Sequence, residues 1–457
     1  MILSKALERF VDKAPITVMA RAAMEHALAT EQIDELFNQR AERQYTRDLL
    51  FSSVVDLMGL VVSKVQPSIH AAYQSVKETL PVSITALYDK LNSVEPGVTS
   101  ALVSHTAERL APVIVGMHGQ LPCLLPGYRV RIIDGNHLAA TQRRLEVLRG
   151  SVAGPLPGHS LVVLDPELML ATHMIPCEDG HAQERSLTDQ ILSLVDANDV
   201  WVADRNFCTG AILRGISEAK GYFVIRQHGN LPFEATSDLS ERGATDTGKV
   251  LEQAIVIRCP DGNLLPARRV VLVLNKATRD GDLEMAILTN LPDTAVSSVV
   301  IADLYRNRWK VETLFQSLTQ MLAGEIDTLA YPRAALLGFG IALASFNILA
   351  TVQAALRGQH GAEKIQEEVS GFYIANEVRI TIGGMAIATI PEDWEVFQSM
   401  SSADLASALL KLAAHAHLPK YKRHPRGPKK PVPKRTQFQD NTHVSTARLL
   451  AARRKSP

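Results

Sequence analysis

The sequence has few cysteines, and they form no pattern that would pair them or hold a metal. Its four cysteines are scattered, with no C-x-x-C and no Cys/His cluster. Neither a zinc site nor a disulfide framework is therefore indicated, and reduced thiols in a cytoplasm fit best. The first residues also lack the apolar stretch of a secretory signal, so we expect a cytoplasmic protein. The cysteines are Cys123, Cys177, Cys208 and Cys259.

The formal net charge is zero, because 48 Lys and Arg balance 48 Asp and Glu. Taken alone, this balance argues against a protein that binds nucleic acid. From Lys420 to Pro457, however, there are twelve basic residues and one acidic residue, Asp440. The tail thus carries about +11 and the remainder about −11. Such asymmetry is typical of an arm that binds nucleic acid, although a solvated tail that only aids solubility has the same composition.

Charged residues are absent from residues 334–356, a length that could span a bilayer. This segment nevertheless contains Ser345, Asn347, Thr351 and Gln353. Polar side chains are costly in hydrocarbon. We therefore predict a buried core helix and no association with a membrane.

Internal repeats are also lacking, and 457 residues exceed one ordinary domain. We predict a helical region at residues 1–122, a core at 123–357, a mixed region at 358–417 and a basic, partly disordered tail at 418–457. Two helical patterns flank Val94-Glu-Pro-Gly97. They fit either a helix-turn-helix or an ordinary helical hairpin.

Two short apolar runs in the core region each end at an aspartate. Residues 130–133 are β-prone and lead to Asp134, which the turn-forming pair Gly135-Asn136 follows. Residues 200–202 form a similar run that leads to Asp204. An aspartate at the exit of a buried strand projects into the crevice where α/β sheets usually hold ligands, although one such aspartate alone is ordinarily a turn or helix cap.

A third motif, Y-x-x-R-x-x-x-E, is formed by Tyr305, Arg308 and Glu312. On one helix, the i, i+3 and i+7 spacing places a phenol, a guanidinium and a carboxylate in a single stripe. In isolation, the motif is more often an exposed helix with an Arg308–Glu312 ion pair. With Asp134 and Asp204, it completes an Asp/Asp/Glu set.

Carboxylate ligands select a hard cation, Mg²⁺ or Mn²⁺, over zinc. Three carboxylates brought together without a cation would repel one another, and a pair of divalent ions removes that conflict. Two such ions about 3.5–4 Å apart form a device for phosphoryl transfer, because they stabilise both the attacking and the leaving oxygen.

At these residues, the sequence resembles the DDE transposases of bacterial insertion sequences, in the branch marked by Y-x-x-R-x-x-x-E. The resemblance covers roughly residues 125–350. It implies an α/β fold with a ribonuclease-H-like mixed sheet core and a β-rich insertion at about residues 210–295. It also implies that the helical region at 1–122 binds the ends of the element, and that a homodimer holds two ends together on double-stranded DNA in the nucleoid.

The resemblance further implies that Asp134, Asp204 and Glu312 are catalytic and hold two Mg²⁺ ions, for which Mn²⁺ could substitute. A strand would be cut to leave a 3′ hydroxyl, which then attacks a phosphodiester across the duplex or in target DNA. We predict DNA contacts from the motif, its neighbours and the basic tail: Tyr305, Arg308, Trp309, Lys310, Lys429, Lys430, Lys434 and Arg435. Of these, Lys310 lies off the stripe, and a half-buried helical tryptophan is the favoured interpretation of Trp309.

The sequence departs from the family pattern at three positions. Gln316 and Thr319 stand where the family often has a lysine after the glutamate, and Asn206 stands where it favours glycine. Two other functions therefore stay open: a DNA-binding relic that represses without cutting, and a two-metal nuclease that takes no part in transposition.

Basic residues of the β-rich insertion allow two interpretations. They could line a DNA channel, or they could be charges on strand faces in water. These residues are Arg226, Arg258, Arg268, Arg269 and Lys276.

Overall fold

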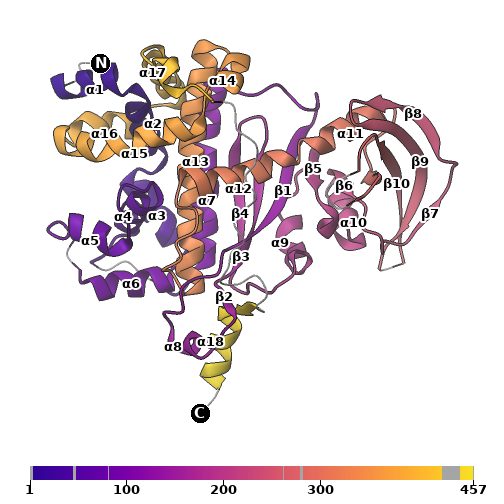
Figure 1. The fold of residues 1–457 in the computed structure, drawn as a ribbon, viewed down its shortest axis with the longest axis horizontal. Helices are drawn as coiled ribbons and strands as arrows, with labels where there is room; N and C mark the ends of the chain where they lie inside the picture. The colour runs from indigo at the N-terminus through magenta and orange to yellow at the C-terminus, as the bar shows by residue number, and fades with distance from the viewer. Residues whose placement is uncertain are drawn as a thin grey trace.

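The computed structural model describes residues 4–44, 48–80, 82–260, 262–277, 281–424 and 443–455. Figure 1 shows a long twisted sheet with a body of helices packed beside it. The strands are β1 (Arg129–His137), β2 (Gly154–Leu156), β3 (His159–Asp165), β4 (Leu170–Cys177), β5 (Asp199–Ala203), β6 (Tyr222–Arg226), β7 (Phe233–Ala235), β8 (Ser240–Thr245), β9 (Gly248–Arg258), β10 (Leu264–Leu274), β11 (Glu284–Thr289) and β12 (His443–Ser445).

The α-helices are α1 (Lys5–Lys13), α2 (Pro15–Ala27), α3 (Thr30–Arg40), α4 (Phe51–Val62), α5 (Ile69–Val76), α6 (Ile84–Ser93), α7 (Pro96–Gly116), α8 (Glu146–Arg149), α9 (Thr188–Leu192), α10 (Gly210–Glu218), α11 (Ser298–Arg306), α12 (Trp309–Met321), α13 (Pro332–His360), α14 (Ala362–Glu368), α15 (Gly371–Ala388), α16 (Glu392–Ser399), α17 (Ser402–Ala414) and α18 (Thr446–Lys455). Three short 3₁₀ helices are η1 (Glu184–Leu187), η2 (Arg205–Phe207) and η3 (Leu418–Tyr421).

The first half of the sheet has the order β4-β3-β1-β5-β6. β1, β5 and β6 are parallel to one another, whereas β3 is antiparallel to both β1 and β4. The connection between the parallel neighbours β5 and β6 contains α10, as such neighbours require a crossover, and α9 lies between β4 and β5 in the chain. This is the predicted ribonuclease-H-like core, and the α/β fold class is confirmed.

Both faces of this core are covered by helices, which explains why its strands bury apolar residues on both sides. Ile132 and Val202 face the core shared with α7, α12 and α13, whereas the adjacent Ile133 and Trp201 face α9 and α10. Alternation along a strand thus fills two hydrophobic layers at once.

The β-rich insertion extends the same sheet in the order β6-β11-β10-β9-β7, with β8 also paired to β9. Its strands lie within the β-rich insertion expected at about residues 210–295. Four of its arginines make contacts within the protein, namely Arg226 to Asp282, Arg258 to Glu234, Arg268 to Glu252 and Arg269 to Gln227. Those side chains are therefore engaged in the fold, whereas Lys276 is exposed.

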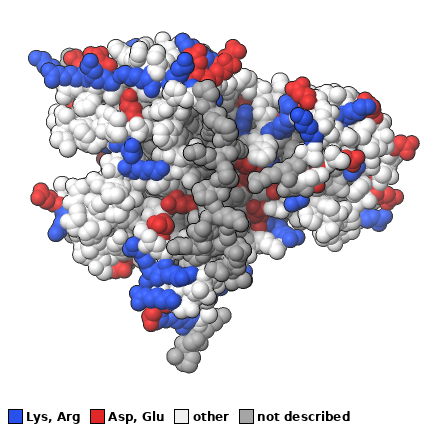
Figure 2. Space-filling model, viewed as in Figure 1, with Lys and Arg blue, Asp and Glu red and all other residues white. Residues whose placement is uncertain are grey.

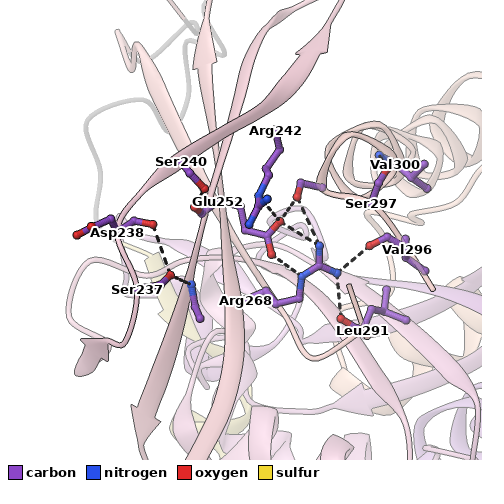
Figure 3. Close-up of polar contacts among 12 residues, drawn as sticks. Ser237, Asp238, Ser240, Arg242, Glu252, Arg268, Leu291, Val296, Ser297 and Val300 are labelled. Carbon is purple, nitrogen blue, oxygen red and sulfur yellow. Dashed lines mark hydrogen bonds and ion pairs between the residues drawn. The ribbon is translucent and has the colours of Figure 1, made fainter. Parts of the chain in front are cut away.

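A buried polar cluster attaches the insertion to α11 (Figure 3). Arg268 Nε donates to Glu252 Oε1 at 2.7 Å. Its Nη1 donates to the carbonyl oxygens of Leu291 at 3.0 Å and Val296 at 2.8 Å. The hydroxyl of Ser298, in the first turn of α11, donates to the same Glu252. The start of α11 is thus positioned by one arginine in β10 and one glutamate in β9.

The N-terminal helices share one hydrophobic core with the helices that follow the sheet. α2 packs against α13, α15, α16 and α17, and α7 packs against α13 and β4. The expectation of a mixed region at 358–417 is wrong, because the described residues there form α14 to α17 with no strand among them. Pairing of α6 and α7 as a DNA-reading helix-turn-helix is also wrong, since α7 lies buried between α13 and the sheet.

α13 is the helix predicted from the uncharged segment, and the prediction of a buried core helix is confirmed. Its length and composition would suffice to cross a membrane, but 89% of its apolar window is buried within the protein. Its buried Asn347 accepts from the Ala171 amide at 2.8 Å and donates to the Ala171 carbonyl oxygen at 2.9 Å. A polar residue in this helix therefore binds the β4 backbone.

The end of the chain returns to the core. β12 pairs in parallel with β2, and α18 packs against α8. The predicted DNA contacts Lys429, Lys430, Lys434 and Arg435 lie outside the described residues.

A buried histidine in α2 makes stability depend on pH. His26 is fully buried, with Nδ1 3.3 Å from Nη2 of Arg109. Burial, reinforced by this cation, lowers the pKa of His26 to about 4. Because an unfolded histidine titrates near 6.5, the unfolded chain binds an extra proton between pH 6.5 and 4. We therefore expect His26 to reduce the free energy of unfolding by up to about 3 kcal/mol as the pH falls through this window.

Urea unfolding of the wild type and of His26→Gln at pH 7.5 and pH 4.5 measures this effect. The difference in stability between the two pH values should be smaller in the variant. An identical pH dependence in both proteins would show that His26 does not carry it.

Candidate active site

The register between β1 and β5 brings the two aspartates together. Ile132 lies opposite Val202 in this parallel pair. Asp134 is two residues after Ile132 and Asp204 is two residues after Val202, so the two aspartates lie at the same edge of the sheet. Asp204 leaves β5 as the N-cap of η2, where its Oδ1 accepts from the Asn206 amide at 2.8 Å. Asp134, by contrast, does not end its strand. β1 continues to His137, paired with β3, so the predicted turn at Gly135-Asn136 is wrong because β3 supplies hydrogen-bond partners on that side.

Glu312 approaches this edge from a helix that crosses the sheet (Figure 1). The expectation of one continuous helix through the motif is wrong, because α11 ends at Arg306 and α12 begins at Trp309. Between them, the amides of Asn307 and Arg308 bond to carbonyl oxygens three residues back, both at 3.0 Å. This tight turn, in which both residues keep helical backbone angles, joins the two helices.

Arg308 connects two of the three acids by hydrogen bonds. Its Nη1 donates to Asp134 Oδ2 at 2.8 Å, and its Nη2 donates to Glu312 Oε1 at 2.7 Å. The Arg308 side chain is only 15% exposed. Burial raises the pKa of Asp134 to about 6; Arg308 opposes this rise, and Asp204 adds to it. Three carboxylates from distant parts of the sequence thus act on one another around a single arginine.

The other predicted contacts of the motif differ in exposure. Tyr305 is 7% exposed, and burial raises its pKa to about 12. Its phenol lies beside Arg308, so in this structure it supports the arginine and does not form an open DNA surface. Trp309 is 62% exposed, so the favoured interpretation as a half-buried tryptophan is wrong. Burial lowers the pKa of Lys310, and the charges of Glu167 and Asp165 oppose this shift.

A fourth carboxylate, Glu184, was not selected from the sequence. It begins η1, and burial raises its pKa to about 7, with Asp204 and Asp134 adding to the rise. The sequence feature that could have pointed to Glu184 is its position at the start of the amphipathic segment that precedes β5. That signal is weak, because no local spacing connects Glu184 to the other acids.

The donor atoms suit a hard divalent cation, since they are carboxylate oxygens. Four acids meet here, whereas Arg308 pairs with two of them. Burial is the main cause of the raised pKa values of Asp134 and Glu184, and the neighbouring carboxylates add to the rise. With Arg308 between Asp134 and Glu312, no three Asp, Glu, His or Cys side chains among the described residues converge closely enough to hold an ion. The site therefore fits a cation in charge and chemistry, and Arg308 would have to move to admit it.

A basic surface lies below the sheet, where α18 packs on α8 (Figure 2). Arg448 pairs with Asp179 and Arg453 pairs with Glu146, both at 2.7 Å. These pairs hold the C-terminal helix against the core. Further exposed arginines on this surface are Arg144, Arg149 and Arg454.

The part of the chain that contains the three acids is similar to known proteins. Residues 126–347 match the family model described as "Transposase DDE domain". This part of the chain is similar to a transposase DDE domain. Asp134, Asp204 and Glu312 all lie within the match, as do Arg308 and Glu184.

One relative comes from Sinorhizobium fredii (strain NBRC 101917 / NGR234) and is named "Putative transposase y4zB". It is 30% identical over 165 residues, which are 35% of this chain and 44% of that protein. The chain thus matches less than half the length of this relative. Together, the family model and the relative support a DDE transposase.

Proposed function

We propose that the chain is a DNA transposase of the Y-x-x-R-x-x-x-E branch, which cuts and joins strands at the ends of an insertion sequence. The observation that carries the proposal is the meeting of Asp134, Asp204 and Glu312 around Arg308, within the residues similar to a transposase DDE domain. Nothing in the local sequence requires these acids to meet, so their convergence supports a shared role.

Asp134, Asp204 and Glu312 would hold two Mg²⁺ ions, or Mn²⁺ in their place. When bound, such ions stabilise charge on the attacking and leaving oxygens of a phosphodiester. Arg308, displaced from the carboxylates, can form paired hydrogen bonds with phosphate oxygens, for which its planar fork is suited. The buried Tyr305 keeps this arginine at the site, and the exposed Trp309 is free to stack on a base.

Double-stranded DNA is the proposed partner. The surface of α8 and α18 and the basic segment with Lys429, Lys430, Lys434 and Arg435 would supply affinity that does not depend on base sequence. Two copies of the chain would hold two element ends, on the nucleoid in the cytoplasm. We retain the N-terminal region 1–122 as a proposed contact for those ends, through surfaces other than the buried α7.

The test uses linear DNA that ends in the inverted repeats flanking the coding sequence, incubated with the full chain and Mg²⁺. We expect cut strands with free 3′ hydroxyls and joined products, both abolished by EDTA. Cutting without joining would instead identify a two-metal nuclease. Binding without cutting would identify a relic that represses. Absence of binding, cutting and joining would overturn the proposal.

A further inference from the structure

We propose that a groove between α12, α13 and α15 binds a phosphate of the DNA backbone, with Arg357 and the N-terminus of α15 as its donors. This inference rests on the proposed function and adds to it a DNA-binding site outside the motif and the basic tail. The groove has a volume of about 860 Å³. Thr313 and Gln320 of α12 and Phe372 of α15 line it and are exposed, so a ligand reaches it from solvent.

Arg357 is a buried cation without a counter-charge. It lies in the last turn of α13, lines the groove and is only 6% exposed. Its Nε donates to the Gly119 carbonyl oxygen at 2.6 Å, whereas Nη2 is shielded from solvent and has no hydrogen-bond partner among the described residues. Burial lowers the pKa of Arg357 to about 10, and no charge in the described part of the chain raises it. Because an unpaired buried charge is costly, an anion in the groove would stabilise this arginine.

The N-terminus of α15 supplies donors to the same groove. Its N-cap Ser370 and its first residues Gly371 and Phe372 all line the groove. No side chain caps this 18-residue helix, and its first turn has no acidic residue. The unpaired amides and the dipole at such a helix end favour an anion. Nε2 of Gln353 lies 3.2 Å from the place that a β-carbon on Gly371 would occupy, so a further N–H donor is close by.

The charges around the groove also favour an anion. The described residues that line it include two arginines, Arg357 and Arg423, against one acid, Glu367. Arg423 is held at the rim, because its Nη2 donates to the Val369 carbonyl oxygen at 3.2 Å. Glu367 is exposed, so water and salt screen its charge, whereas the charge of Arg357 is buried.

The groove lies along the helix that carries the Y-x-x-R-x-x-x-E motif. α12 contacts β1 as well as α13 and α15, and so connects the sheet with the helical body (Figure 1). Trp309, Thr313 and Ser317 recur every four residues and therefore share one face of α12. Ser317 is about 7.5 Å further along the helix than Glu312. Since successive nucleotides of a strand rise by about 3.4 Å, a strand held at Glu312 would reach the groove within a few nucleotides.

Aromatic rings at the rim favour DNA over a free anion. Phe372 is 50% exposed. Its ring makes an edge contact with Tyr373 at a centroid distance of 5.6 Å, and Tyr373 makes another with His424 at 6.1 Å. An exposed ring beside cations is the combination that binds a nucleic acid strand, because the ring stacks on a base while the cations take phosphates.

Arg357→Met tests the cation. Binding of the full chain to fluorescently labelled end DNA is measured by anisotropy in EDTA, over a series of salt concentrations. We expect about tenfold weaker binding at about 0.1 M salt, and a slope of log K against log salt that is shallower by about 0.9. The loss should be equal on DNA of scrambled sequence, because phosphates carry no sequence information. Wild-type affinity and slope, or a loss confined to one sequence, would overturn the proposal.

Ser370→Asp separates phosphate binding from support of the fold. Aspartate is a favoured N-cap and its charge suits a helix N-terminus, so the Tm should not fall. The same carboxylate repels a phosphate in the groove, so DNA binding should weaken about tenfold. This variant also decides the question if Arg357→Met fails to fold.

Ala403→Asp is the matched control for Ser370→Asp. It adds a carboxylate to the first turn of α17, at an exposed residue that does not line the groove. It should bind DNA as the wild type does. Equal affinities of Ser370→Asp and Ala403→Asp, at either level, would show that the groove holds no phosphate.

The same measurements separate this inference from the proposed function. If the wild type cuts and joins DNA while Arg357→Met and Ser370→Asp bind it with wild-type affinity, the groove is not on the DNA path and the transposase proposal stands. If the wild type does not bind DNA at all, both proposals fail.

Discussion

Glu312→Gln should abolish DNA cleavage while the fold and DNA binding remain nearly unchanged. The amide keeps the shape of the carboxylate and can still accept from Arg308, so the packing of α12 is preserved. It loses the negative charge that a divalent ion requires. A loss of about 4 kcal/mol of transition-state stabilisation corresponds to a rate reduction of about 10³-fold.

Single-turnover cleavage of end DNA in Mg²⁺ measures this loss, and a gel-shift titration measures binding. Glu363→Gln is the control, because Glu363 is an exposed glutamate of α14 far along the chain from the motif. It should cut at the wild-type rate. If Glu312→Gln also cut at that rate, Glu312 would have no part in the reaction.

Arg268→Met should lower the free energy of unfolding by about 3–5 kcal/mol, because it removes the close ion pair of the buried Glu252 and leaves it only the Ser298 hydroxyl and the exposed Arg242 at 3.8 Å. Arg268 also bonds two carbonyl oxygens between β11 and α11, and these would lose their donor. Since the cluster holds the start of α11, and α12 follows it directly, the effect should extend to the position of Glu312. We expect cleavage to fall along with stability.

Urea unfolding provides the measurement, and Arg258→Met provides the control. The Arg258–Glu234 pair is exposed on both sides, so its loss should cost less than about 1 kcal/mol. Replacing both Arg268 and Glu252 with apolar residues should recover part of the loss, because no unpaired charge then remains. Equal effects of Arg268→Met and Arg258→Met would refute the anchoring role of the cluster.

Strand patterns were the part of the fold most readily predicted from sequence. The apolar runs before Asp134 and Asp204 form neighbouring parallel strands because both faces of that sheet are buried. The insertion strands were equally recognisable, since their β-branched residues and intervening turns are local features. The uncharged segment became α13 because a helix buried on all sides needs no polar face.

Other features depended on partners that no local pattern reveals. The break between α11 and α12 and the exposure of Trp309 follow from how the helix crosses the sheet. α15, α16 and α17 lie against α2, which is more than 300 residues away in the chain. Glu184 joins the other acids only because η1 packs on η2.

Sequence alone determined which side chains could perform the chemistry, because residue type and spacing within one strand or helix are local properties. It also indicated that each aspartate would follow a buried apolar run. Only the tertiary structure decided that Arg308 lies between Asp134 and Glu312, that Tyr305 is buried and that Glu184 is a neighbour. Those outcomes depend on contacts between residues far apart in the chain, and long-range packing is what positions each charge relative to the others.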